Sequence, residues 1–112
     1  MPSISVNSTN LAANTRTANI IAGDPNEFVY YDATVRVYQV SSASGIRTTI
    51  MADTDVVVDD KEILGIGTSL DTSAHLFAEF SIDANTRLSV FLRETAGVAT
   101  TDVLTLLDIE AD

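Results

Sequence analysis

The chain has 112 residues, no cysteine and a formal charge of −10, from 16 acidic and 6 basic residues. One domain of this length can bury a core without disulfides, and no apolar run approaches the roughly 20 residues that span a bilayer. This charge disfavours a general binder of nucleic acid or of anionic membranes, unless the few cations gather on one surface.

Near its start, the chain alternates polar and apolar residues over 3–7, which predicts a short strand. A second stretch, 15–21, can return beside it, so an N-terminal β-hairpin is expected. The turn residues Gly-Asp-Pro-Asn at 23–26 follow, and 28–31 then lead into the central part of the chain.

The central stretch holds two runs of β-branched and aromatic residues, 33–40 and 46–51, separated by a Ser- and Gly-rich segment. This pattern predicts a hairpin, with Val37 opposite Thr48. That register collects the apolar side chains on one face: Ala33, Val35, Val37, Ile46, Thr48 and Ile50. The opposite face carries Thr34, Arg36, Tyr38, Arg47, Thr49 and Met51. Two of the six basic residues are therefore expected on one exposed surface.

The acidic cluster between Asp53 and Glu62 lacks the regular ligand spacing and central glycine of a calcium loop, and is expected to be a solvated loop. No metal or cofactor is predicted. No nucleophile, base and orienting group recur at a plausible spacing, so the chain is not expected to be an enzyme. Residues 76–82 alternate as a strand with one apolar face.

Residues 83–112 fit two periodicities. Leu88, Val90 and Leu92 alternate as in a strand, yet a helical stripe also begins after Asp83, a candidate N-cap. The members of this stripe are Ala84, Leu88, Phe91, Leu92 and Thr95. Gly97 would end that helix, and Thr100 or Thr101 would cap a second one, with Val103, Leu106 and Leu107 as its stripe.

The order of caps, stripes and glycine favours two helices. The prediction is therefore a single α+β domain over 1–112, mainly β over 1–82 and a helical hairpin over 83–112. The alternative is an all-β decoration or binding module on a virion or cell surface, with 84–109 forming two more strands.

This order resembles the coat proteins of the small single-stranded RNA bacteriophages. The local similarity is strongest in three segments: Ala33-Thr-Val-Arg-Val-Tyr38, Arg47 to Asp59, and Leu88 to Leu107. The resemblance implies a viral structural protein whose two C-terminal helices pack across the sheet of a dimer partner. The homodimers would assemble in the host cytoplasm into an icosahedral capsid enclosing single-stranded RNA.

In that family, arginine or lysine, threonine or serine, and tyrosine on the inner sheet face contact an RNA hairpin. The matching positions here are Arg36, Arg47, Thr49 and Tyr38. The resemblance therefore implies the subunit itself and RNA as partners, weakly or non-specifically bound, and neither a membrane nor a small-molecule substrate.

Overall fold

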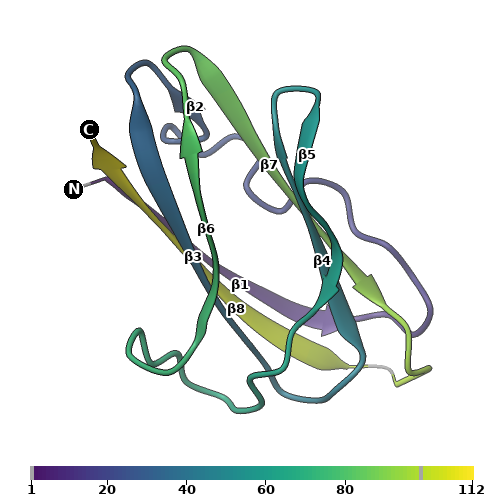
Figure 1. Ribbon diagram of the computed structural model, residues 1–112. Helices are drawn as coiled ribbons and strands as arrows, with labels where there is room; N and C mark the ends of the chain where they lie inside the picture. The colour runs from purple at the N-terminus through teal and green to yellow at the C-terminus, as the bar shows by residue number, and fades with distance from the viewer. Residues whose placement is uncertain (1, 99) are drawn as a thin grey trace.

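The computed structural model describes residues 2–98 and 100–112, and these form eight β-strands and no helix (Figure 1). In chain order the strands are β1 (Ser3–Leu11), β2 (Phe28–Val29), β3 (Ala33–Ser41), β4 (Ile46–Ala52), β5 (Asp55–Glu62), β6 (Leu76–Ile82), β7 (Thr86–Glu94) and β8 (Thr101–Ala111). The part of the chain that is described thus has no helix that could cross a membrane.

The strands build two antiparallel sheets, in the orders β1-β8-β3-β6 and β2-β7-β4-β5. Within them, first pairs with last, second with seventh, third with sixth and fourth with fifth. This nested order is the one that a single long hairpin would have. When such a hairpin wraps around itself, β8 also pairs with β3 and β7 also pairs with β4, which joins the four pairs into two sheets. The result is an eight-stranded jelly roll, in which the apolar sides of the two sheets face each other.

The predicted helical hairpin, and with it the α+β class, is wrong. Residues 86–94 and 101–111 are strands β7 and β8. Leu88, Val90 and Leu92 are all 0% exposed and point into the core, as strand alternation requires. Leu88 and Leu92 also fit a helical stripe, because a spacing of four residues falls on one face in either structure. Gly97 occupies a turn between the two strands, with a φ of 74°.

The predicted central hairpin is also wrong in its pairing. Strands β3 and β4 have nearly the expected bounds, but they belong to different sheets, and the loop between them crosses the sandwich. The predicted apolar face is nevertheless confirmed, because all six of its residues are 0% exposed. They meet across the interior, where Thr48 Oγ1 donates a hydrogen bond to Gln39 Oε1 at 2.8 Å and so links the two sheets.

The predicted N-terminal hairpin does not form either. Strand β1 pairs with β8, with Ile4 opposite Leu107. Its expected partner runs along β7 instead, on the side away from β4 and beyond the short strand β2, where the amides of Thr17 and Ile20 donate to Leu92 and Val90 carbonyls at 2.8 and 2.9 Å. The strand predicted at 76–82 is confirmed as β6, whereas most of the expected acidic loop is strand β5.

Candidate functional site

The four residues predicted to contact RNA are divided between two surfaces. Arg36 and Tyr38 lie on the outer face of β3, whereas Arg47 and Thr49 lie on the outer face of β4. Because β3 and β4 belong to sheets that pack back to back, these two pairs point away from each other. The structure therefore puts Arg36 and Tyr38 on one surface and Arg47 and Thr49 on another, so the four predicted residues do not form one site.

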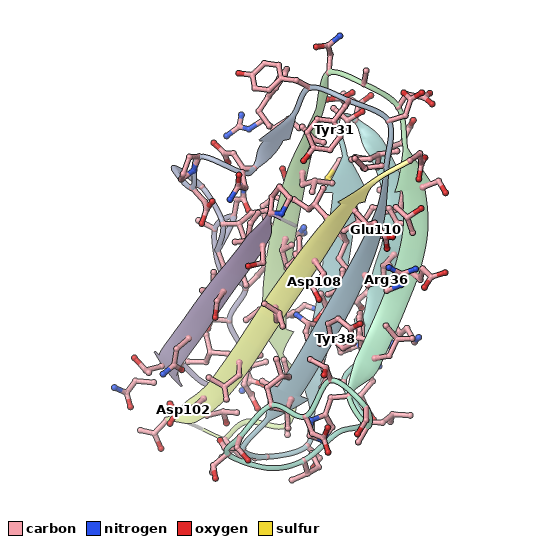
Figure 2. All side chains as sticks on the ribbon, turned by 90° about the vertical axis from the view of Figure 1, so that its left-hand side faces the viewer. Tyr31, Arg36, Tyr38, Asp102, Asp108 and Glu110 are labelled. Carbon is pink, nitrogen blue, oxygen red and sulfur yellow. The ribbon has the colours of Figure 1, made fainter. Side chains whose placement is uncertain are left out.

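The outer surface of the first sheet is acidic (Figure 2). Arg36 lies opposite Asp108 of β8, and its Nε and Nη1 donate to the carboxylates of Glu79 and Glu110 at 2.8 and 2.7 Å. These bonds hold the pKa of Arg36 above its ordinary value. Asp102 lies farther along β8 on the same side. We term this surface the acidic face. Its one positive charge, on Arg36, and its four negative charges, on Glu79, Asp102, Asp108 and Glu110, give these five residues a net charge of −3.

An apolar row crosses the acidic face beside its charged residues. Leu106 of β8 lies opposite Tyr38 of β3, and Tyr38 lies opposite Leu76 of β6. Leu106 and Tyr38 are half-buried, and Leu76 is 54% exposed. Leu76 faces outward because the register shifts between β3 and β6 at this point, and Phe77 turns into the core in its place.

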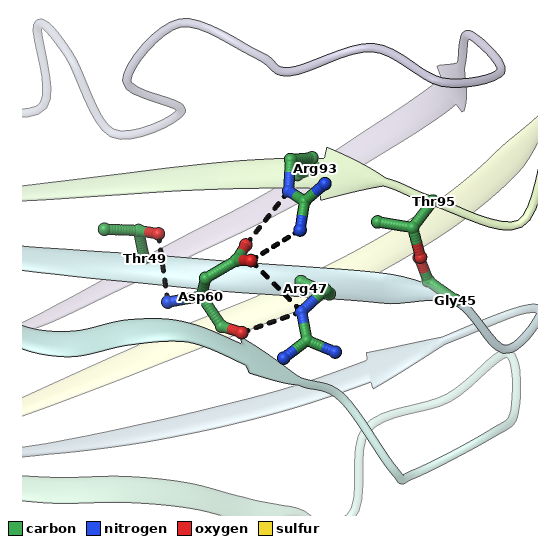
Figure 3. A network of polar contacts seen from close by, with 6 residues as sticks. All are labelled: Gly45, Arg47, Thr49, Asp60, Arg93 and Thr95. Atoms are coloured by element: carbon green, nitrogen blue, oxygen red, sulfur yellow. Dashed lines mark hydrogen bonds and ion pairs between the residues drawn. The ribbon is translucent and has the colours of Figure 1, made fainter.

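The outer surface of the second sheet holds a network centred on Asp60 (Figure 3). Arg93 of β7 lies opposite Arg47 of β4, and both bind this one carboxylate. Arg93 Nε donates to Asp60 Oδ1 at 3.1 Å, while Arg47 Nε donates to Asp60 Oδ2 at 3.2 Å and to its carbonyl at 2.8 Å. The Asp60 amide donates to Thr49 Oγ1 at 3.2 Å. The Arg93 hydrogen bond is the main cause that lowers the pKa of Asp60.

A shallow cleft of about 390 Å³ adjoins this network. Its apolar lining includes Met51, Val56 and Phe91, and the guanidinium of Arg16 stands 5.0 Å from the centre of the Phe91 ring. A cation over an aromatic face is an attractive arrangement, and it leaves the outer side of the guanidinium exposed to an anion.

Arg87 of β7 completes this side, with an ion pair of 3.6 Å to Glu27. Four of the six basic residues thus lie on one side of the molecule, which we term the arginine face: Arg16, Arg47, Arg87 and Arg93. The concentration predicted from the sequence, with Arg36 and Arg47 on one exposed face, is therefore wrong, because these two residues lie on opposite sides of the sandwich. The arginines of the arginine face lie among carboxylates, since Glu62 is opposite Arg47, Asp60 binds Arg47 and Arg93, and Glu27 binds Arg87.

Sequence reasoning missed Arg16, Asp60, Phe91 and Arg93. It placed Phe91 and Arg93 in a helix and Asp60 in a solvated loop. The signal that could have found two of them is the alternation within β7, where Arg87, Phe91 and Arg93 interleave with the three buried apolar residues.

Within the described ranges, no three metal-ligating side chains group together. No protein-family model and no curated protein matches the chain. Charge and shape of the two outer faces are therefore the features from which a function can be argued.

Proposed function

We propose that the chain is a structural subunit of a virion, a jelly-roll coat or decoration protein that assembles with further copies of itself. The observation that carries this proposal is the nested strand order. Viral capsid domains share this architecture with lectins and cupins, so the fold supports the proposal by analogy. An icosahedral form of the shell and an enclosed RNA are part of the same proposal.

The two outer faces favour assembly over catalysis. Their charged side chains pair mainly with one another, as Arg36 does with two glutamates and Asp60 with two arginines. Both faces also offer apolar side chains next to the charges, among them Leu106 and Phe91. A polar surface that surrounds exposed apolar groups is typical of protein interfaces.

The direct test is the oligomeric state of the purified protein. Light scattering coupled to size exclusion over a wide concentration range should show species larger than the 11.9 kDa monomer. Electron microscopy of the same samples should show closed particles or ordered arrays. A strictly monomeric protein at every concentration would contradict the proposal.

A second candidate function, a glycan-binding module on a virion or cell surface, is favoured by a separate observation. Phe28, Tyr30 and Tyr31 are exposed at one end of the sandwich, with Tyr30 at 70%, and line a cleft of about 240 Å³ with Asn26. Exposed aromatic rings can stack on the C–H faces of sugars, and an amide can bond their hydroxyls.

This candidate is tested by screening a glycan panel with the wild type and with Tyr30→Ala. Leu64→Ala is the matched control, because Leu64 is also exposed, at 77%, but lies away from this cleft. Binding that Tyr30→Ala abolishes and Leu64→Ala retains would support a glycan site. Absence of binding by the wild type would leave assembly as the function.

A further inference from the structure

The last strands of the two sheets lie beside each other on one side of the sandwich and leave a groove between them. Strand β6 ends the first sheet and β5 ends the second, so among the described residues each pairs on one side alone. Three clefts, of about 380, 700 and 150 Å³, follow one another between these strands. The first two share Val57 and the last two share Leu76 and Phe77, so they form one continuous groove, which we term the edge groove.

We propose that the edge groove binds an extended, basic segment of another protein, which adds to β6 as a further strand of the first sheet. Such a segment alternates apolar and cationic side chains, because successive residues of a strand point to opposite faces. This partner goes beyond the proposed function, and its binding does not depend on self-assembly.

The first argument is the free backbone of β6. Over 78–82 this strand pairs with β3 in regular register. The Phe77 carbonyl already accepts a hydrogen bond from the groove side, where Lys61 Nζ of β5 donates to it at 2.9 Å. Alternate residues of an antiparallel strand direct their amides and carbonyls to the same side, so those of Glu79 and Ser81 also face the groove. An incoming extended segment can pair with a strand edge of this kind.

The edge of β5 is not suited to such pairing and forms the opposite wall of the groove. Its register with β4 shifts twice, on either side of Ile50, and Asp60 within it has a φ of 48°. Bulges interrupt the regular row of backbone groups that an added strand needs. The groove therefore offers hydrogen bonds on β6 and a wall of side chains on β5.

The second argument is the charge of the groove, which identifies its occupant. The lining includes one lysine, Lys61, and six carboxylates: Asp53, Asp55, Asp59, Glu62, Glu79 and Asp83. Arginines outside the groove balance two of them, since Arg36 binds Glu79 and Arg47 lies opposite Glu62. The other four carboxylates form no ion pair within the described residues. Such a rim attracts a basic segment and repels RNA, and it also repels a second copy of a chain whose charge is −10.

The third argument is the apolar floor between the charged rims. Val57 and Leu76 are 37% and 54% exposed, while Val58 and Phe80 pack against the margin of the core. Phe80 lies opposite Val35, so it points to the inner side of the first sheet. A strand added to β6 places every second side chain on this floor. The intervening lysine or arginine side chains are long enough to reach the rim carboxylates.

The probe for this site is a fluorescently labelled peptide with the seven-residue length of β6, in which lysine and valine alternate. Fluorescence anisotropy at low salt should show that the wild type binds it, and added salt should weaken binding because exposed charges are screened. Glutamate in place of lysine should lower the affinity about tenfold or more. N-methylation of one alternate set of backbone amides should abolish binding and methylation of the other set should not, because only one set faces β6.

Two variants of the protein locate the site. Asp59→Asn with Asp83→Asn removes two charges from the groove and should weaken peptide binding about fivefold. Asp102→Asn with Asp108→Asn is the matched control, because it makes the same charge change on the outer face of β8, and it should bind like the wild type. Circular dichroism verifies that both variants keep the β-sheet spectrum.

A wild type that does not bind the lysine–valine peptide at low salt would overturn the inference. Equal weakening in the two variants, or equal binding of the two methylated peptides, would do the same, because either result would show unspecific attraction to an acidic protein. If the peptide dissociates wild-type assemblies in light scattering, the groove is an interface between copies, and this inference is again wrong. Assemblies that form without binding the peptide would overturn this inference alone and leave the proposed function intact.

Discussion

Glu94 is a buried carboxylate that holds the loops at one end of the sandwich. It is 2% exposed, and its Oε1 accepts the amides of Asn14 and Gly97 at 3.1 and 2.8 Å, while Oε2 accepts that of Ala96 at 3.2 Å. The hydrogen bond from the Asn14 amide is the main cause that lowers the pKa of Glu94 below its usual value. The ionised form therefore stabilises the folded chain.

We expect Glu94→Gln to lower the thermal midpoint by several degrees at pH 7, because a glutamine offers one acceptor oxygen and turns an NH₂ toward backbone donors. A depressed folded pKa gives stability that is present above the unfolded pKa, about 4.3, and is lost as the pH falls through the folded value. The difference between wild type and variant should thus shrink below about pH 4.3. Thermal unfolding followed by circular dichroism from pH 3 to 7 measures it.

Asp83→Asn is the control for this titration, since Asp83 is exposed and its side chain makes no hydrogen bond within the described residues. Its midpoint should match that of the wild type at every pH. A Glu94→Gln protein with an unchanged midpoint at pH 7 would remove the loop-holding role of this carboxylate.

Gly45 is required where the chain crosses from one sheet to the other. Its φ is 94°, and a Cβ at this position would lie 2.5 Å from that of Ala96. Gly23 has a similar φ of 86°, but a Cβ there would meet nothing within 4 Å. The two glycines therefore separate backbone strain from steric overlap.

We predict that Gly23→Ala costs about 1 kcal/mol of unfolding free energy, from the left-handed backbone alone. Gly45→Ala should cost about 2 kcal/mol more, because the overlap with Ala96 forces a backbone shift. Urea denaturation of both variants gives the comparison. Equal losses of unfolding free energy in the two variants would show that the loop at Ala96 can move aside without cost.

At the scale of the elements, strand positions could be predicted where alternation is strict, as in 33–40, 46–51 and 76–82. Pairing could not, because a strand that is buried on one face fits any neighbour with a complementary face. The segment 41–45 resembles a hairpin turn locally, yet the contacts that carry it to the other sheet come from Thr95, which donates twice to the Gly45 carbonyl. Because Thr95 and Gly45 lie far apart in the chain, their contact leaves no signal in the residues around 41–45.

The candidate site could not be predicted from the sequence either, because it too depends on which strands pair. Alternation puts Arg47 and Thr49 on the outward-facing side of their strand, as the structure does. Their neighbours Asp60 and Arg93 come from other strands, and these become adjacent only through the fold of the whole chain. Arg36 was grouped with them only because the two strands were expected to pair.

The hydrogen bonds of Gln39 join three strands through the core. Gln39 is 2% exposed, donates to Thr105 Oγ1 at 3.1 Å and accepts from Thr48 Oγ1 at 2.8 Å. Gln39→Leu should lower the unfolding free energy by about 1–3 kcal/mol, because two buried hydroxyls lose their partner. The triple variant with Thr48→Val and Thr105→Val should recover most of this loss in urea denaturation. A triple variant less stable than Gln39→Leu would show that the network itself stabilises the core.

At the scale of the molecule, the distribution of charge also decides where RNA can bind. Arg36 is neutralised by two glutamates on a face of net negative charge, whereas on the arginine face Arg47 and Arg93 share one carboxylate and Arg16, over the Phe91 ring, forms no ion pair within the described residues. Phosphates and unstacked bases favour the second environment. RNA contact stays a prediction, and the arginine face is where we expect it.

Arg47→Ala should therefore reduce the slope of log affinity against log salt for a single-stranded oligoribonucleotide by about 0.7, the value for one lost phosphate contact. Arg36→Ala should leave that slope unchanged. Fluorescence anisotropy of a labelled oligonucleotide at several salt concentrations measures both. An equal effect of the two substitutions would argue against the asymmetry.

The pairing of β1 with β8 has a consequence for the time at which a subunit can first act. On the ribosome, β1 has no partner until β8 has been synthesised, and the many long-range pairs of the sandwich favour slow folding, in milliseconds to seconds. The acidic face is built on β3 and β8, with Asp102, Asp108 and Glu110 supplied by the later strand. Until β8 has been synthesised, a nascent chain can therefore neither complete its first sheet nor present the acidic face. This face cannot take part in association while the earlier strands are being translated.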